Sequence, residues 1–255
     1  MELLKIDAVR RVFNTRLGQK PCVALKSVSF EVCAGEFVAI MGPSGSGKST
    51  LLNIIASLDK PSGGDVYLGG RSLKSIPERE LAEFRRDNLG FVFQEFNLLD
   101  TFSVKDNILL PLVLARTPVA EMEERLVPVA RELSIDELLN KFPYEISGGE
   151  KQRAAVARAV ITNPRLLLAD EPTGSLDSRA SAGLLERFSA LHRNGRTILM
   201  VTHSALAASH AGRVLFIRDG EIFSQLYRGE DGDRAFYERI VSSLTVLEDG
   251  GAADA

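Results

Sequence analysis

The sequence predicts an α/β fold in which strand-rich segments at both ends of the chain flank a mainly helical middle. Two observations carry this prediction. Short, near-continuous apolar runs at residues 37–41, 166–169 and 197–201 are typical of parallel strands that are covered on both faces. Residues 96–163 read differently, since within them the stretch 121–133 alternates charged and apolar residues with a helical period.

Composition and charge narrow the class of protein. Of the 255 residues, 45% are hydrophobic and 25% are charged, as in ordinary soluble globular proteins, and this length suits one large domain with or without an inserted subdomain. The formal net charge of −3 argues against a nucleic-acid partner. No apolar run approaches the ~18 residues that cross a bilayer, and the N-terminus lacks the pattern of a signal peptide. Cys22 and Cys33 are too few for a disulfide scaffold and are expected as reduced thiols.

The first part of the chain predicts strands, one glycine-rich turn and a helix. Apolar and polar residues alternate over 23–32, which predicts a strand with one exposed face. The buried strand 37–41 runs into glycines, and a helix is expected over 49–58. A hairpin is expected around 65–70 and a further buried strand at 89–93.

The second part of the chain predicts helices that separate strands, and then a hairpin. The alanine-rich stretch 150–162 favours a helix. Another helix is expected over 178–192, between the apolar runs at 166–169 and 197–201. Residues 214–223 predict a late hairpin that turns at an Asp-Gly pair.

One segment between a predicted strand and a predicted helix matches the pattern G-x-x-x-x-G-K-[ST]. It consists of Gly42, Pro43, Ser44, Gly45, Ser46, Gly47, Lys48, Ser49 and Thr50. The glycines allow a tight turn that brings backbone N–H groups to phosphate oxygens, and the following helix points its positive dipole end at the same anion. Lys48 is expected to bind the β- and γ-phosphates of ATP, and Ser49 the accompanying Mg²⁺ ion. A chance match in a flexible loop would lack this context.

Two acids complete the predicted chemistry. The apolar strand 166–169 ends in Asp170 and Glu171. Asp170 suits coordination of Mg²⁺, and Glu171 suits a general base that polarises the attacking water. Taken alone, the pair equally fits a solvated acidic turn, but next to a phosphate-binding loop the catalytic interpretation is favoured.

Polar residues follow two more predicted strands. Gln94 comes directly after the strand 89–93 and is expected to reach the metal or the water. His203 comes after the strand 197–201 and is expected to contact the γ-phosphate. Each residue alone is also compatible with a plain capping role, so the interpretation depends on the whole set.

A second anion-binding segment opens the alanine-rich helix. Ser147 suits the N-cap position, and Gly148 and Gly149 expose N–H groups at the start of the helix. A plain Gly-Gly turn is the alternative. Because the chain has two such segments but one lysine-bearing loop, two copies are expected to share their nucleotides.

This segment, Ile146 to Arg153, resembles the signature motif of ATP-binding cassette (ABC) ATPases, and the other motifs occur in the order typical of that family. Residues 42–50 resemble Walker A, Gln94 the Q-loop and 166–171 Walker B. The remaining counterparts are the D-loop at 175–177, the switch histidine at His203 and, at Phe13, the aromatic residue that stacks on adenine. The usual LSGGQ sequence differs here at Ile146 and at Glu150, which places an acid near the anion site.

The resemblance covers roughly residues 1–225 and implies a P-loop NTPase fold of the ABC type, with a RecA-like core, an antiparallel β subdomain and an inserted α-helical subdomain. The core and β subdomain are expected over 1–94 and 164–228, the helical subdomain over 95–163, and a C-terminal helix over 229–247. The small, acidic residues 248–255 are expected to be disordered.

The family also implies an activity and partners. It predicts hydrolysis of ATP, with Lys48, Glu171 and His203 in catalysis and with Ser49, Gln94 and Asp170 around Mg²⁺. It further predicts an ATP-dependent head-to-tail homodimer in which 147–150 of one subunit cover the ATP of the other. An integral-membrane permease would hold the dimer at the cytoplasmic face of the membrane.

Finer features resemble the ATPases of bacitracin-resistance transporters, which act in antimicrobial-peptide resistance and sensing. They are the stretches 87–101, 107–111 and 212–227. Lipoprotein-release and macrolide-efflux ATPases share most of these motifs and are the alternative. A soluble ABC ATPase acting on nucleic acid or ribosomes is a remote alternative, because such chains usually carry coiled coils or two cassettes. A nucleotide switch without turnover is disfavoured by the presence of Glu171.

One hypothesis concerns the permease. An apolar patch of Phe96, Leu98 and Leu99 follows Gln94 closely. At this position the patch is expected to respond to whether ATP or ADP is bound. The patch either receives a permease helix or fills the core of the helical insertion. The variant Leu98→Asp tests the first interpretation, which predicts release of the permease with the fold intact.

Overall fold

The computed structural model describes residues 1–13 and 21–249. The chain forms two compact units, residues 1–79 with 197–255, and residues 80–196. The second unit contains the predicted helical insertion together with flanking strands, and the predicted domain boundaries stay a prediction. Of the segment expected to be disordered, residues 250–255 lie outside the described residues.

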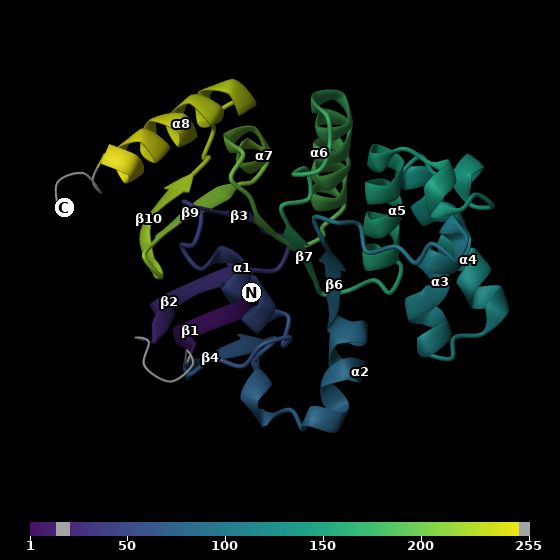
Figure 1. The fold of residues 1–255 in the computed structure, drawn as a ribbon, viewed down its shortest axis with the longest axis horizontal. Coiled ribbons are helices and arrows are strands. Elements are labelled where there is room, and N and C mark those ends of the chain that lie inside the picture. The colour runs from purple at the N-terminus through teal and green to yellow at the C-terminus, as the bar shows by residue number, and fades with distance from the viewer. Residues whose placement is uncertain (14–20, 250–255) are drawn as a thin grey trace. The chain divides into compact units, whose positions relative to one another are not determined.

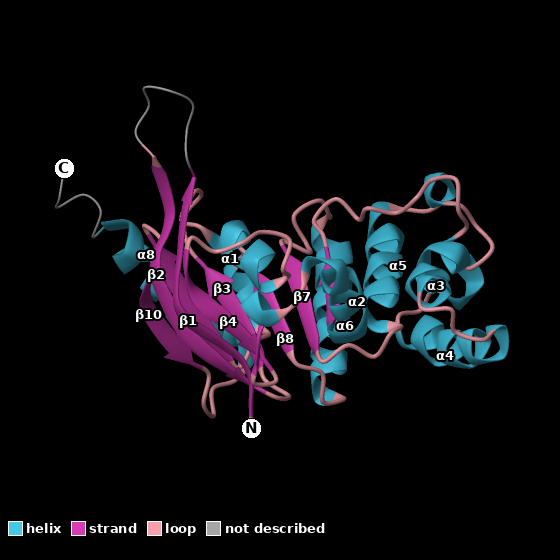
Figure 2. Cartoon of the chain, turned by 90° about the horizontal axis from the view of Figure 1, so that it is seen from below, coloured by secondary structure: helices cyan, strands magenta, loops and turns pink. Residues whose placement is uncertain are grey.

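The first unit contains an antiparallel sheet with strand order β2-β1-β4-β5. Its strands are β1 (Glu2–Phe13), β2 (Cys22–Cys33), β4 (Gly63–Leu68) and β5 (Arg71–Ser72). Figures 1 and 2 both show β2, β1 and β4 side by side. Leu25, Val28 and Val32 are buried as the alternation predicts, but the expectation for Val23 is wrong, because that side chain is 43% exposed. Register shifts between β1 and β2 break the strict alternation, since each shift changes which face a side chain occupies.

The same unit holds strands in the order β10-β9-β3-β8. The strand β3 (Phe37–Met41) is buried throughout and pairs in parallel with β8 (Ile198–Val201) and with β9 (Arg213–Arg218). The predicted hairpin is confirmed by the antiparallel pairing of β9 with β10 (Glu221–Tyr227). The helices of this unit are α1 (Lys48–Ile55), the 3-10 turn η1 (Leu73–Ser75), α7 (Ala205–Ser209) and α8 (Asp233–Asp249).

An ion pair between Arg213 and Glu36 lies at the start of β3. Arg213 is 8% exposed, and its Nε lies 2.8 Å from Oε1 of Glu36. Its Nη2 donates to Oε2 of Glu36 at 3.2 Å, and the same carboxylate oxygen accepts from the backbone N–H of Cys33 at 2.9 Å. Glu36 therefore ties the end of β2, the start of β3 and the start of β9 together.

The second unit is built on two parallel strands, β6 (Leu89–Val92) and β7 (Leu166–Asp170). Its helices are α2 (Glu78–Asn88), which begins just before the unit, and α3 (Val104–Leu114), α4 (Val119–Glu132), α5 (Gly148–Val160) and α6 (Ser178–Arg193). Two 3-10 turns, η2 (Asp136–Leu138) and η3 (Pro143–Glu145), join α4 to α5. In Figure 1, α3, α4 and α5 lie together, as the helical middle of the sequence predicts.

The helix α2 was not expected as an element. Phe84 is its one buried residue, and its sequence is otherwise rich in charge. Its two large apolar residues, Leu81 and Phe84, have helical spacing, but so few residues are not enough to identify a helix from the period alone.

Two expectations about composition can be compared with the described residues. Cys22 and Cys33 are exposed free thiols, as predicted. Within residues 1–13 and 21–249, no helix combines the length and the apolar character needed to cross a bilayer.

Candidate functional site

The predicted phosphate loop joins β3 to α1 in the first unit, as the motif requires. Two of its glycines are needed for packing. A Cβ atom on Gly42 would lie 2.0 Å from the carbonyl oxygen of Ile217, and one on Gly47 would lie 2.5 Å from that of Ala24. Gly47 also has a φ of 100°, which favours glycine. The loop therefore passes so close to neighbouring backbone that only glycine fits at these positions.

The loop presents an anion-binding surface. The first turn of α1 has N–H groups without intrahelical acceptors, and the N-cap Gly47 brings no side chain to satisfy them. The ammonium of Lys48 donates to the carbonyl oxygens of Gly42 at 2.8 Å and Pro43 at 2.9 Å. The hydroxyl of Ser46 is buried and has no hydrogen-bond partner among the described residues. A buried polar group without a partner is costly, so this hydroxyl fits a loop built to bind a ligand oxygen.

Strand register places His203 beside this loop. The parallel pairing of β3 with β8 matches Ile40 with Val201, and the backbone N–H of Thr202 donates to the carbonyl of Ile40 at 3.1 Å. Gly42 follows β3 directly and His203 follows β8 by two residues, so both come after the carboxyl ends of neighbouring parallel strands, and His203 is exposed. The predicted contact of His203 with the γ-phosphate stays a prediction.

The second unit brings Gln94 and Glu171 together in the same way. The parallel pairing of β6 with β7 runs to Val92 and Ala169, and Gln94 and Glu171 follow shortly after the carboxyl ends of these strands. A Cβ atom on Gly174 would lie 3.0 Å from Nε2 of Gln94 and 3.3 Å from the carbonyl oxygen of Glu171, so the two segments approach each other here. The hydroxyl of Ser175 in the predicted D-loop donates to the carbonyl of Gln94 at 3.3 Å. Asp170 ends β7. These polar groups therefore form one cluster at this edge of the unit.

The backbone at Glu171 is strained. Its φ of 45° lies in the left-handed region, which costs a non-glycine residue about 1–2 kcal/mol. The following Pro172 also restricts the conformation of Glu171. Strain of this kind persists where the surroundings enforce it and concentrates at functional sites.

The predicted signature segment begins α5. Ser147 is the N-cap, and its hydroxyl accepts from the backbone N–H of Glu150 at 3.4 Å. The carboxylate of Glu150 in turn accepts from the backbone N–H of Ser147 at 2.8 Å and from its hydroxyl at 2.7 Å. This capping box lowers the pKa of Glu150, chiefly through the hydrogen bond from the Ser147 side chain. Glu150 is therefore an anion at neutral pH.

The two glycines of this segment differ in their structural roles. A Cβ atom on Gly149 would lie 2.9 Å from Cβ of Ala180, so glycine permits the close approach of α5 and α6. A Cβ atom on Gly148 would make ordinary contacts, the nearest at 3.7 Å to Phe96. Packing thus accounts for Gly149, whereas Gly148 fits a need for exposed N–H groups.

Phe13 ends β1 next to residues outside the described part of the chain. Its ring is 38% exposed, and the guanidinium of Arg11 lies 4.4 Å from the ring centroid. The exposure is compatible with the predicted stacking on adenine, which stays a prediction.

Sequence reasoning missed two polar residues of α5. The amide of Gln152 is buried and donates to the carbonyls of Phe93 and Pro172, beside Gln94 and Glu171. The guanidinium of Arg158 donates to the carbonyl of Phe96 at 2.9 Å and to that of Asn97. Burial lowers the pKa of Arg158. One signal in the sequence could have found them. Gln152 and Arg158 lie on either side of the alanine-rich stretch 154–157, which is apolar enough to be expected in the core.

The residues fit ATP and Mg²⁺. Taken by itself, the first unit has a phosphate loop with a buried hydroxyl that has no partner among the described residues, and the second unit, taken by itself, has carboxylates after a strand end. Within the described residues, no group of histidine, cysteine, aspartate and glutamate side chains is large enough to hold a metal on its own. Mg²⁺ takes few protein ligands and completes its octahedron with water and nucleotide phosphates. Ser49, Gln94 and Asp170 have the required oxygen atoms.

The fold and these motifs define an ATPase of the ABC class. The ABC transporter family matches the chain over residues 25–174, and the chain belongs to this family. A dimeric ATP-binding cassette, MJ0796, solved in a post-hydrolysis state with ADP and Pi, superposes with a TM-score of 0.80 at 36% identity and covers 88% of this chain and 98% of that one.

Two curated relatives match almost end to end. The ABC transporter ATP-binding protein YxdL of Bacillus subtilis (strain 168) is 50% identical over 96% of this chain and 95% of its own length. The bacitracin export ATP-binding protein BceA of Halalkalibacterium halodurans is 46% identical over 97% of both chains. The predicted family, fold class and ATPase activity are thereby confirmed.

Proposed function

We propose that this chain is the ATP-hydrolysing subunit of a bacitracin-type transporter, held at the cytoplasmic face of the membrane by a permease. The end-to-end similarity to BceA supports the branch, because both chains are covered at 97%. The lipoprotein-release and macrolide-efflux branch is the alternative.

The proposed chemistry assigns one role to each polar group. Lys48 and the N–H groups of the phosphate loop bind and orient the phosphates, and His203 contacts the γ-phosphate. Asp170 and Ser49 hold Mg²⁺ with Gln94. Glu171 accepts a proton from the water that attacks the γ-phosphate. Mg²⁺, when bound, neutralises charge that develops on the phosphate oxygens.

The observation that supports hydrolysis, rather than binding alone, is the proximity of Gln94 to the turn at Glu171 in the second unit. A Cβ atom on Gly174 would lie 3.0 Å from Nε2 of Gln94 and 3.3 Å from the carbonyl oxygen of Glu171. We expect the amide and the carboxylate to reach the same water. A nucleotide switch without turnover would not need a base at this place.

A second copy of the chain is proposed to complete the site. Ser147, Gly148 and Gly149 of one subunit cover the ATP that Lys48 of the other subunit holds. The dimeric state of MJ0796 supports this arrangement. Such a two-fold interface is closed by ATP and opened by hydrolysis.

Hydrolysis is tested with Glu171→Gln, which keeps the size of the side chain and removes the base. Purified protein should bind ATP, form dimers and lose at least ~99% of its ATPase activity. The matched control is Glu186→Gln, an exposed position on α6 that should hydrolyse ATP like the parent. Undiminished hydrolysis by Glu171→Gln would refute the role of this residue.

The branch is tested in membranes that contain the chain with its co-purifying permease. The bacitracin-type interpretation predicts that bacitracin stimulates ATP hydrolysis and that a macrolide does not. Stimulation by a macrolide or by a lipoprotein alone would favour the alternative branch.

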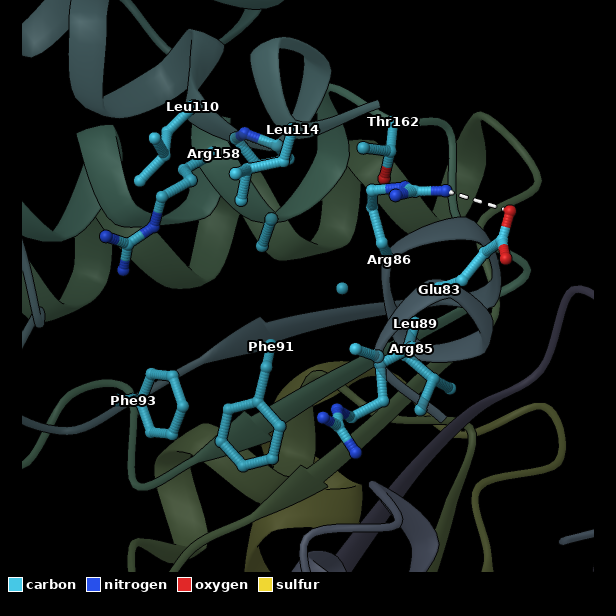
Figure 3. Close-up of a pocket in the computed structure, with 14 residues that line it drawn as sticks. Glu83, Arg85, Arg86, Leu89, Phe91, Phe93, Leu110, Leu114, Arg158 and Thr162 are labelled. Carbon is cyan, nitrogen blue, oxygen red and sulfur yellow. Dashed lines mark hydrogen bonds and ion pairs between the residues drawn. The ribbon is translucent and has the colours of Figure 1, made fainter. Parts of the chain in front are cut away.

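A pocket in the second unit suits the permease. Its volume is about 650 Å³. It lies between α2, β6, α3 and α5, and its lining residues are Ala82, Glu83, Arg85, Arg86, Leu89, Gly90, Phe91, Phe93, Leu110, Pro111, Leu114, Arg158, Ala159 and Thr162. Figure 3 shows Phe91 and Phe93 on one side and Leu110, Leu114 and Arg158 on the other. We name it the β6 pocket.

The charges of the β6 pocket indicate the chemistry of its occupant. Of its charged side chains, Glu83 is ion-paired with Arg86 at 3.5 Å, and the hydrogen bonds of Arg158 go to main-chain carbonyls. With Arg85, the lining has three arginines and one acid. We therefore propose that a short permease segment binds here through apolar side chains and at least one carboxylate.

Two neighbouring residues of α3 provide a matched test. Leu114 lines the β6 pocket and is 66% exposed, whereas Val113 does not line it and is 53% exposed. Leu114→Asp should abolish co-purification of the permease, and Val113→Asp should preserve it. Arg85→Glu should weaken co-purification and the loss should be larger at low salt.

The earlier patch of Phe96, Leu98 and Leu99 lies outside this lining. Leu98→Asp therefore separates the two surfaces. Loss of the permease with Leu98→Asp but not with Leu114→Asp would move the docking site to that patch.

A further inference from the structure

Gln152 is a buried amide in a helix that is otherwise built of small apolar residues. Its exposed fraction is 0%, and its neighbours along α5 include Ala154, Ala155 and Val156, all equally buried. Burying an amide costs free energy unless its polar atoms are hydrogen-bonded. A residue of this kind inside an alanine-rich helix therefore needs a specific explanation.

The side chain of Gln152 is hydrogen-bonded through its nitrogen and not through its oxygen. Its Nε2 donates to the carbonyl oxygen of Phe93 at 3.0 Å and to that of Pro172 at 2.9 Å. Because both partners can only accept, they fix which end of the amide is the nitrogen. Oε1 is buried and has no partner among the described residues. The side chain is thus held by its two donor hydrogens.

Both acceptors are next to residues of the proposed site. Phe93 precedes Gln94, and Pro172 follows Glu171. Gln94 and Glu171 follow the carboxyl ends of neighbouring parallel strands, and the Cα of Gly174 lies close to both the amide of Gln94 and the carbonyl of Glu171. One side chain of α5 therefore bonds to the backbone beside each of them.

Glu171 depends on such support because its φ of 45° is strained. Hydrogen bonds on both sides of Glu171 hold this turn. The backbone N–H of Gly174 donates to the carbonyl of Glu171 at 2.9 Å, and Gln152 donates to the carbonyl of Pro172 at 2.9 Å. The second bond connects the turn directly to α5.

We propose that Gln152 is a positioning residue for ATP hydrolysis, which fixes Gln94 and Glu171 relative to each other and to α5. Since α5 begins at Ser147, a displacement of the signature segment reaches both residues through this one amide. This inference rests on the proposed function.

The test uses the complete ATPase in its dimeric, hydrolysing form. Gln152→Met retains most of the side-chain volume and removes both donors. We expect kcat to fall by about tenfold or more, with the KM for ATP within about twofold, because phosphate binding does not involve this residue. The control is Val156→Ala, which removes buried volume from the same helix and should retain most of the parent kcat. An equal loss of kcat in the two variants, or no loss in Gln152→Met, would overturn the proposal.

Gln152→Glu adds a readout that depends on protonation. A carboxylate donates nothing, whereas the neutral acid donates one O–H, and burial raises the pKa of a carboxyl group. The activity of Gln152→Glu relative to the parent should therefore rise as the pH falls from 8 to 6. A ratio that stays flat and low across this range would contradict the donor role.

A double variant tests the proposed connection to Gln94. If the two residues act as a unit, Gln152→Met should lower kcat less in a Gln94→Ala background than in the parent. Full additivity would contradict the proposal. The outcomes also separate the two claims. A parent chain that does not hydrolyse ATP would overturn the proposed function, whereas a hydrolysing parent with an unaffected Gln152→Met would overturn this inference alone.

Discussion

Replacing Glu150 by glutamine should tighten the ATP-driven dimer. Glu150 accepts hydrogen bonds from both the N–H and the hydroxyl of Ser147. Since Ser147 is proposed to cover the other subunit's ATP, we expect the same hydroxyl to bind its γ-phosphate. The carboxylate and the phosphate therefore compete for one donor and repel each other. Glutamine still accepts both bonds, so the capping box and the helix should remain.

The structure sets the scale of this effect. Oε2 of Glu150 lies 2.7 Å from the Ser147 hydroxyl, and a phosphate oxygen bonded to that hydroxyl would be at a similar distance on its other side. The two anionic oxygens would then be no more than about 5.4 Å apart, which corresponds to a repulsion of about 1–3 kcal/mol for effective dielectric constants between 80 and 20. Screening at this partly exposed position favours the lower end, so we expect an affinity gain of about fivefold per site.

The assay is sedimentation velocity of the dimer as ATP is titrated, in a Glu171→Gln background that does not hydrolyse ATP. The control is Glu145→Gln, because Glu145 also caps a helical turn, with its carboxylate accepting from the backbone N–H of Phe142 at 2.7 Å. The control should leave the dimer affinity unchanged. The gain from Glu150→Gln should shrink as salt is raised.

The pKa of Glu150 predicts how the gain in dimer affinity depends on pH. Hydrogen bonds from Ser147 lower this pKa below the ordinary value of 4.5, so the group is charged throughout pH 6–8 and the gain should be constant there. The stability that this cap contributes is present above the unfolded-state pKa and is lost as the pH falls through the lowered folded-state pKa. Equal dimer affinities for the parent and Glu150→Gln at low salt would refute the reasoning.

Three further variants test the fold and the phosphate loop. Gly90→Ala should lower the free energy of unfolding by about 3 kcal/mol or more in urea titrations, because its Cβ would lie 2.2 Å from the carbonyl oxygen of Ala159, and an unchanged midpoint would contradict this contact. Glu36→Gln should cost about 3 kcal/mol by leaving Arg213 buried without its carboxylate, and adding Arg213→Met should recover part of the loss if the ion pair is the cause. Lys48→Ala should weaken binding of a fluorescent ATP analogue by about 50-fold, and unchanged affinity would remove Lys48 from the phosphate site.

Much of the site could be predicted because its motifs are local in sequence. The phosphate loop, the acids after β7 and the capping Ser147 each occupy a short segment, and the strand that leads into each loop is apolar enough to be recognised. The pairing of β6 with β7 then brings together two segments that are far apart in the sequence. Gln94 and Glu171 could be proposed as functional from their positions after strand ends, but only the structure shows that β6 pairs with β7 and that both residues lie beside Gly174.

The parts that sequence reasoning missed depend on tertiary contacts. Gln152 looked like one polar residue of a helix, because its acceptors belong to two distant segments and are main-chain atoms, which carry no residue-type signal. Val23 was misplaced because bulges shift the register of its strand. The glycine at 149 was interpreted from its N–H group, yet the neighbouring Ala180 explains it through packing alone.

The resting position of Lys48 has a consequence for the energetics of nucleotide capture. Its ammonium already donates to the carbonyls of Gly42 and Pro43, so ATP meets a loop whose cation is engaged. Binding is then an exchange, in which two carbonyl acceptors are replaced by phosphate oxygens, and only the difference between the two sets of bonds contributes to affinity. The same bonds tie Lys48 to the first two residues of the loop, so fewer conformations are open to this segment and less conformational entropy is lost when phosphates bind.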